Sequence, residues 1–143
     1  MQKQKNNVEE SILNIVRGCD AVVLATVAPD GMPDARHLTN ALNRDAAGLG
    51  LMFLTGRTTP KVAQIASNPK CCLYYYNEET HYSVRLYGTL ELVTDAATLR
   101  AYWRDDFRRF GYAGPDDPDF VLMRFAPAAY KYYDASGPVA GGL

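Results

Sequence analysis

The chain has 143 residues, of which 48% are hydrophobic and 22% are charged, a profile typical of one soluble globular domain with its own core. The formal net charge is -1 at pH 7, so no overall positive charge attracts nucleic acid or an anionic membrane. No apolar run approaches the roughly 20 residues of a membrane-spanning helix, and the polar start lacks the apolar core of a signal peptide. The sequence therefore predicts a cytoplasmic protein without nucleic-acid or membrane partners.

The first elements in chain order are a helix and a hairpin. Residues 1–6 are polar and are expected to form a mobile tail. Apolar residues then recur at helical spacing and predict a helix over residues 7–18. Residues 21–28 are rich in β-branched side chains, and residues 33–40 follow after the turn Pro29-Asp30-Gly31. The pattern predicts two antiparallel strands.

The middle of the chain predicts three further strands and a short helix. Residues 49–55 are apolar on both faces, as in a strand that is buried on both sides. A helix is expected from Pro60 to Ser67, because proline fits the first helical position and Asn68-Pro69 stops the run. Strands are predicted over residues 71–76 and 82–93, with a bulge or sharp bend at Gly88.

The last third predicts a helix, a strand and a mobile end. Thr94 or Asp95 caps a helix that runs to about Phe110, and Gly111 closes it. Residues 120–133 predict the sixth strand, and the tail from residue 136 is expected to be mobile. Residues 1–143 form a single domain in this interpretation. Six predicted strands and three predicted helices favour an α+β fold that is mainly β. The expected architecture is a small six-stranded antiparallel barrel with flanking helices.

Positive charge gathers at the start of the predicted helix over residues 60–67. Arg57 and Lys61 flank a position that the aligned peptide dipoles already make positive by about half a charge. Asp45 is the only acid between residues 44 and 70. Free backbone N–H groups lie at the same place, together with the hydroxyls of Thr55, Thr58 and Thr59. The arrangement predicts an anion site, with phosphate as the natural ligand; the alternative is that both cations point into water.

Other candidate groups are less specific. The three cysteines, two of them adjacent, do not form a disulfide framework, and no cysteine or histidine spacing resembles a metal site. Five tyrosines cluster around the predicted hairpin of residues 71–93, where a core or a dimer interface is the favoured interpretation and flavin stacking the alternative. They are Tyr74, Tyr75, Tyr76, Tyr82 and Tyr87. No group of residues resembles a Ser-His-Asp triad or a pair of catalytic carboxylates.

Three segments occur in a fixed order over roughly residues 12 to 94. They are ATVAPDGMPDARHL, then LMFLTGRTTPKVAQIASNPKCCLYYY, then VRLYGTLELV. The ordered set, with T-x-x-x-x-P-K and a following N-P, resembles the FMN-binding split-barrel proteins related to pyridoxamine 5'-phosphate oxidase, especially their small general-stress-protein-like members. The resemblance implies a six-stranded split barrel and a homodimer that holds FMN in a groove between its subunits.

The resemblance also implies which residues hold the cofactor. The second strand and the strand-loop-helix that carries the lysine contact the flavin ring and its phosphate in this family. The corresponding positions here are Arg36, His37, Leu38, Thr39, Leu54, Thr55, Thr59, Pro60 and Lys61. Arg57 adds a cation at a position where the motif varies. The assignment agrees with the anion site that charge and helix capping predict.

The chain departs from the family's oxidase in one respect. The arginine-rich W-R-x-x-P signature that grips a pyridoxal-type substrate is replaced by YKYYDASGPVAGGL, so vitamin-B6 oxidase activity is not expected. The favoured function is a flavin-dependent oxidoreductase that passes electrons from a reduced nicotinamide or deazaflavin to a small organic acceptor. His37 is a candidate proton donor. The alternatives are a non-catalytic flavin binder or sensor, and a haem-binding protein in which His37 or His81 serves as axial ligand.

Overall fold

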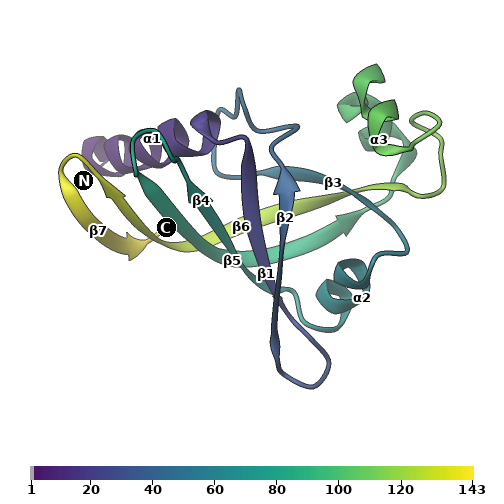
Figure 1. The fold of residues 1–143 in the computed structure, drawn as a ribbon, viewed down its shortest axis with the longest axis horizontal. Coiled ribbons are helices and arrows are strands. Elements are labelled where there is room, and N and C mark those ends of the chain that lie inside the picture. Colours follow the sequence, from purple (N-terminus) through teal and green to yellow (C-terminus); the bar gives the residue numbers. More distant parts are fainter. Residues whose placement is uncertain (1) are drawn as a thin grey trace.

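The computed structural model describes residues 2–143, with side chains from residue 7 onward. Figure 1 shows the elements in chain order. They are α1 (Gln2–Gly18), β1 (Ala21–Val27), β2 (Pro33–Thr39), β3 (Met52–Gly56), α2 (Pro60–Ser67), β4 (Lys70–Tyr76), β5 (Ser83–Val93), α3 (Ala96–Tyr102), the 3-10 helix η1 (Asp105–Phe110), β6 (Phe120–Asp134) and β7 (Gly137–Gly142).

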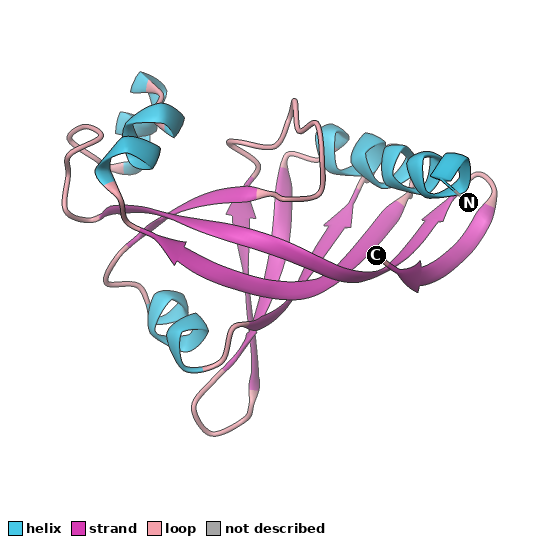
Figure 2. Cartoon of the chain, turned by 180° about the vertical axis from the view of Figure 1, so that it is seen from behind, coloured by secondary structure: helices cyan, strands magenta, loops and turns pink. Residues whose placement is uncertain are grey.

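All strands belong to one antiparallel sheet that does not close on itself. Its strand order is β2-β1-β4-β5-β6-β3, and β7 pairs with β6. The long strand β6 pairs with β3 through its first part and with β7 through its last part, while β5 runs along its other edge. The path therefore ends at β2 and β3, each of which leaves one edge without a partner strand in the described chain. Figure 2 shows this strongly bent, open sheet with the helices around it.

A bulge bends the two longest strands. Tyr87 pairs with Ala129 and Gly88 with Pro127, so Ala128 is the extra residue. A Cβ atom at position 88 would lie 2.0 Å from the carbonyl oxygen of Ala126, a distance that only glycine avoids. The bend predicted at Gly88 is confirmed, and it lets β5 and β6 serve both halves of the curved sheet.

The core has two parts. The apolar side of α1 packs on the inner face of the sheet, where Ile12, Leu24, Leu73 and Leu86 have no accessible surface. A smaller cluster around Phe107 joins α3 and η1 to the strands β3, β5 and β6. The smaller cluster fixes η1 beside the open end of the sheet, which becomes important for the site. No helix in the described residues has the length and apolarity needed to cross a membrane.

Three expectations need correction. The tail from residue 136 was expected to be mobile, but residues 137–142 form strand β7. Gly137 (φ 94°) makes the turn that folds this strand back on β6. This Gly-rich strand pairs through its backbone, so its side chains gave no strand signal. The helix expected from residue 7 begins at Gln2, which places most of the predicted tail in α1; Met1 lies outside the described residues.

The third correction concerns the helix expected from residue 95 to residue 110. Asp95 caps α3 through Thr98, as predicted, but the helix ends at Tyr102 and η1 follows. Trp103 has an extended backbone (ψ 137°), and its indole ring packs edge-on against Phe107 and Phe120. Packing of this one large ring in the smaller core cluster outweighs continuation of the helix.

Candidate functional site

A cavity of about 250 Å³ lies where the open sheet leaves its two end strands unpaired. The end of β2 forms one wall, and β3 and the first turn of α2 form another. The last residue of η1 and the segment that follows it contribute one aromatic ring each. The lining residues are His37, Leu38, Thr39, Ala41, Phe53, Leu54, Thr55, Gly56, Thr59, Lys61, Phe110 and Tyr112. Edge strands offer backbone donors and acceptors that no neighbouring strand uses, so this cavity suits a planar ligand with polar edges.

The structure brings most of the predicted site residues to this cavity. His37, Leu38 and Thr39 come from β2, Leu54 and Thr55 from β3, and Thr59 and Lys61 from the start of α2. Arg36, Arg57 and Pro60 do not line it. The predicted segments therefore meet at one cavity, whereas two of the three proposed cations, Arg36 and Arg57, are not among its lining residues.

Lys61 is the cation of the cavity. Its side chain is half-buried, and none of the described carboxylates lies within ion-pair distance of its amine. Burial lowers the pKa of Lys61 below its ordinary value, and the positive charge of Arg36 lowers it further. Such a lysine gains stability when an anion binds beside it, because the anion restores the interactions lost with water.

The start of α2 offers further donors. Thr59 is the N-cap residue, but its side chain makes no capping bond; its hydroxyl donates to the carbonyl oxygen of Gly56 at 2.8 Å. The hydroxyl oxygens of Thr55 and Thr59 lie 3.4 Å apart. Pro60 occupies the first helical position and has no N–H group to offer. Two hydroxyls and the positive end of the helix therefore face the same side as Lys61.

Arg36 is held in a network on the inner face of the β1–β2 hairpin. Its Nη1 donates to Thr26 Oγ1 at 2.6 Å, and its Nη2 donates to Asp34 Oδ2 at 2.9 Å and to Gln64 Oε1 at 3.1 Å. Gln64, from α2, donates to the same Asp34 oxygen at 3.0 Å. Thr26 and Gln64 are buried. We call these four residues the Arg36 network; it fastens α2 to the hairpin.

Arg57 fastens a loop. Its Nε donates to the carbonyl oxygen of Pro118 at 2.9 Å, and its backbone N–H donates to the carbonyl oxygen of Asp119. The same loop places the Asp119 carboxylate beside Gly56, where a Cβ atom would lie 3.0 Å from it. The sequence argument that no acid lies near this helix start therefore holds only for neighbours in sequence, because the fold brings in Asp119.

Sequence analysis missed the aromatic side of the cavity. In the sequence prediction Phe110 marks the end of a long helix, and neither Phe110 nor Tyr112 is assigned to the cofactor site. In the structure Gly111 adopts a left-handed conformation (φ 97°) after η1, and the rings on either side of it line the cavity. Burial raises the pKa of Tyr112, and the carboxylates of Asp119 and Asp117 raise it further, so its hydroxyl stays protonated. The one sequence signal near these rings was Gly111, which predicts the end of the preceding helix.

Comparison with known proteins decides the family. The family model described as pyridoxamine 5'-phosphate oxidase matches residues 8–134, nearly the whole chain. The chain belongs to the pyridoxamine 5'-phosphate oxidase family. A curated relative, the pyridoxine/pyridoxamine 5'-phosphate oxidase of Azorhizobium caulinodans, is 36% identical over 77 residues. That match covers 54% of this chain and 35% of the relative, so the matched segment spans well under half the length of that relative.

Solved structures confirm the split-barrel fold. A protein related to general stress protein 26 from Clostridium acetobutylicum superposes with a TM-score of 0.80 at 24% identity, covering 94% of this chain and 96% of the other. A pyridoxamine 5'-phosphate oxidase-related, FMN-binding protein from Nostoc punctiforme gives 0.64 at 20% identity, covering 94% and 95%. At these identities the likeness establishes the fold, and the ligand named for the second protein is a property of that protein.

Proposed function

We propose that the protein binds FMN in the cavity between β2 and β3 and acts as a flavin-dependent oxidoreductase. The observation that carries the proposal is Lys61: a half-buried cation without a described carboxylate partner, at the start of a helix, on the wall of a cavity between two free strand edges. A phosphate beside a planar, polar-edged ring matches that combination of groups. The family and its FMN-binding member support the same choice.

The residues of the cavity fit the two ends of FMN. Lys61 and the Thr55 hydroxyl would hold the phosphate, with Lys61 acting as a point charge, and the Thr59 hydroxyl would join them by turning away from the Gly56 carbonyl oxygen. The backbone of residues 37–39 and 53–55 would meet the polar edge of the ring, because rigid strands present alternating donors and acceptors. Arg36 would act indirectly, by holding α2 in place and by adding positive charge near Lys61.

The bound flavin would supply the electron-transfer chemistry, and the protein would supply position, charge and access. We propose a reduced nicotinamide or deazaflavin as the electron donor and a small organic molecule as the acceptor. His37 is the exposed imidazole on the cavity wall and would be the group that gives or takes a proton.

The visible spectrum of protein purified from cells tests the cofactor. We expect the paired flavin bands near roughly 370 and 450 nm, which are properties of the flavin itself. A haem band near roughly 400 nm would instead identify a haem protein, for which His37 is the histidine at the cavity. Oxidation of NADPH, NADH or a reduced deazaflavin by the FMN-loaded protein then separates an oxidoreductase from a non-catalytic flavin binder. Flavin bands without any turnover would contradict the proposed activity.

FMN titration of a lysine variant tests the site. Lys61→Ala should weaken FMN binding by about 1–3 kcal/mol, the range for a lost hydrogen bond to a charged group. Lys70→Ala is the matched control, because Lys70 is an exposed lysine in β4 that does not line the cavity. Equal FMN affinity in both variants would contradict the site, whatever the spectrum shows.

We also propose a homodimer and a cytoplasmic location. The outer face of the sheet exposes Val23, Tyr74, Tyr76 and Tyr133 by 37%, 39%, 43% and 50%, an apolar and aromatic surface of the kind that subunits bury. Sedimentation at micromolar concentration should give a dimer, and a monomer would contradict it. Three free cysteines are consistent with a reducing compartment.

A further inference from the structure

A carboxylate lies beside the end of the cavity that is proposed to hold phosphate. Gly56, the last residue of β3, lines the cavity. A Cβ atom on Gly56 would lie 3.0 Å from Asp119 Oδ2 and 3.4 Å from Thr59 Cγ2. Glycine at this position therefore leaves room for the acid next to the residue that caps α2. An anion held by Lys61 and the two threonine hydroxyls has this negative charge as a near neighbour.

Backbone pairing holds Asp119 in that position. Gly56 pairs with Phe120 in the β3–β6 ladder, and the backbone N–H of Arg57 donates to the carbonyl oxygen of Asp119 at 2.9 Å. The backbone N–H of Asp119 donates to Asp117 Oδ1, also at 2.9 Å. Because its main chain is held on both sides, the carboxylate of Asp119 can move only by rotation of the side chain.

The charge of Asp119 is not neutralised by an ion pair. Among the described residues, no cation lies within 4 Å of its carboxylate. Arg57 donates its Nε to the carbonyl oxygen of Pro118 instead. Burial raises the pKa of Tyr112, and the charge of Asp119 raises it further, so this charge acts on a residue of the cavity wall. A like charge so close opposes the binding of an anion.

The same carboxylate suits the protein without a ligand. The aligned peptide dipoles place roughly half a positive charge at the start of α2, and the first turn of this helix contains no acid. Asp119 supplies a negative charge near that point from a loop that is distant in sequence. It therefore stabilises the start of α2 when no ligand is bound, and it repels the phosphate of a ligand that binds there.

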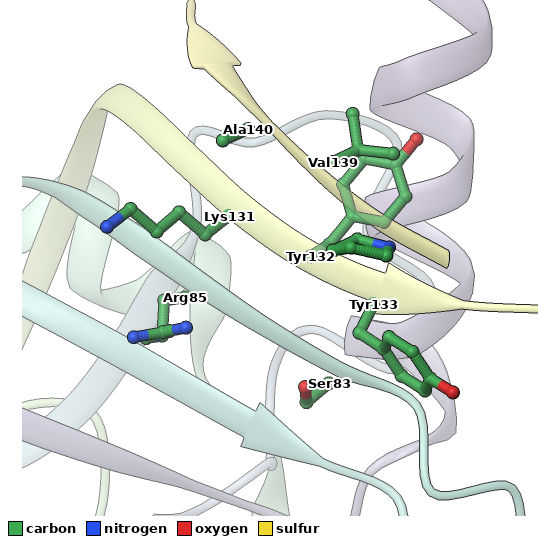
Figure 3. A pocket seen from close by; sticks show the side chains of 8 residues that line it. Ser83, Arg85, Lys131, Tyr132, Tyr133, Val139 and Ala140 are labelled. Atoms are coloured by element: carbon green, nitrogen blue, oxygen red, sulfur yellow. The ribbon is translucent and has the colours of Figure 1, made fainter. Parts of the chain in front are cut away.

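The cations of the outer face are not part of this arrangement. Arg85 on β5 and Lys131 on β6 are directly opposite in the antiparallel pairing, and Tyr133 lies near them (Figure 3). In the proposed dimer that face is buried, so these two cations are not available to a phosphate. Lys61 is the cation at which an effect of Asp119 on anion binding can be measured.

We propose that Asp119 is a specificity-determining residue of the cavity, which sets how strongly the site distinguishes a phosphorylated flavin from an unphosphorylated one; this role rests on the proposed function. The negative charge of Asp119 reduces the contribution of the phosphate to binding. Contacts of the flavin ring with the free strand edges and with Phe110 therefore carry most of the recognition. A site without this charge would favour phosphate-bearing ligands more strongly.

Inorganic phosphate, FMN and riboflavin are suitable probes, because riboflavin has the same ring as FMN and no phosphate. Phosphate binding to the full chain is followed by backbone NMR, and flavin binding by fluorescence. At low ionic strength, Asp119→Asn should bind phosphate and FMN about five- to tenfold more tightly than wild type does, and riboflavin equally well. The gain should shrink in high salt, because salt screens exposed charges. Glu78→Gln is the matched control, since it removes an exposed carboxylate from the β4–β5 turn, outside the cavity.

Two further variants separate the effect of charge from effects on folding and from binding elsewhere. Asp119→Ser removes the charge with a smaller side chain and should give the same gain. Without ligand, neither Asp119 variant should melt above wild type, because the start of α2 loses its offsetting charge. Lys61→Ala should lose the phosphate response with or without Asp119, which shows that the response arises in the cavity and not at Arg85 and Lys131.

The outcomes for Asp119 and for the cofactor can be told apart. Equal phosphate affinity in wild type and both Asp119 variants would overturn the proposal, and so would a gain for riboflavin as large as that for FMN. Weaker phosphate binding in both variants would overturn it as well and make Asp119 a supporting residue of the site. A phosphate gain without flavin binding in any variant supports the role of Asp119 and contradicts the proposed cofactor. FMN binding that depends on Lys61 but not on Asp119 contradicts the role of Asp119 and leaves the cofactor site in place.

Discussion

Two of the cations predicted to hold the cofactor, Arg36 and Lys61, have opposite surroundings. Arg36 donates to a threonine, a glutamine and an aspartate, so its charge is satisfied inside the fold. Lys61 borders a cavity, is half-buried, and has no ion-pair partner among the described residues. The difference separates a cation that the fold uses from one that is available to a ligand. The resemblance assigned both residues to the cofactor site, because a sequence motif shows charge without showing what surrounds it.

The largest effect that tests this difference is expected from Arg36→Ala, which should lower the stability of the fold. Loss of the guanidinium removes a charged donor from the buried oxygens of Thr26 and Gln64, which keep only the hydrogen bond from Thr26 Oγ1 to Gln64 Oε1. The loss should cost about 1–3 kcal/mol of unfolding free energy in urea. Arg100→Ala, which removes an exposed arginine paired with Asp116, should change stability little. A variant with wild-type stability and a large loss of FMN affinity would show that Arg36 is a ligand residue after all.

A smaller effect is expected from the aromatic side of the cavity. Phe110→Ala should weaken FMN binding by about 1 kcal/mol, the scale of one aromatic contact, with little change in stability because the ring is 38% exposed. Tyr102→Ala is a close match in exposure, at 40%, and lies outside the cavity. If the two variants bind FMN alike in a fluorescence titration, the η1 segment is not part of the cofactor site.

Lys61 should also affect the pH dependence of stability in the cofactor-free protein. Its pKa is lower in the folded protein than in the unfolded chain, so its protonated form costs the folded state stability. That cost is fully present below the folded pKa and disappears as the pH rises toward the ordinary value of 10.5. Lys61→Met should therefore melt above wild type near neutral pH in the cofactor-free state, and the gap should close at alkaline pH. A lower melting temperature would indicate that Lys61 serves the fold.

The smallest effect belongs to Asp34. The hydrogen bond from Gln64, followed by the charge of Arg36, lowers the pKa of this exposed carboxyl. Asp34 therefore contributes stability that is present above its ordinary pKa of 3.8 and is lost as the pH falls through the lowered folded value. In Asp34→Asn that contribution is absent, so wild type and variant should differ slightly at neutral pH and converge in acid. Parallel melting curves at every pH would contradict this role.

The limits of α2 and the position of the β-bulge could be predicted from local sequence patterns. Pro60 and Asn68 fix the limits of α2, and the structure has the same bounds. Gly88 marks the bulge, because only a residue without Cβ avoids the opposite carbonyl group. By contrast, β7 carries no side-chain pattern, and the break after Tyr102 depends on how Trp103 packs against Phe107 and Phe120. Backbone pairing and contacts between rings that are distant in sequence produce no pattern in the local sequence, so neither feature could be predicted.

The candidate site divides in the same way. The α2 side of the cavity could be predicted from the sequence, because a lysine at the start of a helix adds its charge to the positive end of the helix dipole, and the β2 side followed from the family resemblance. Only the tertiary structure decided which charges remain available: it turned Arg36 toward Asp34 and Gln64, used Arg57 to hold a loop, and brought Phe110 and Tyr112 to the cavity. The physical reason is that a charge is satisfied or left free by groups distant in sequence, and folding alone brings those groups together.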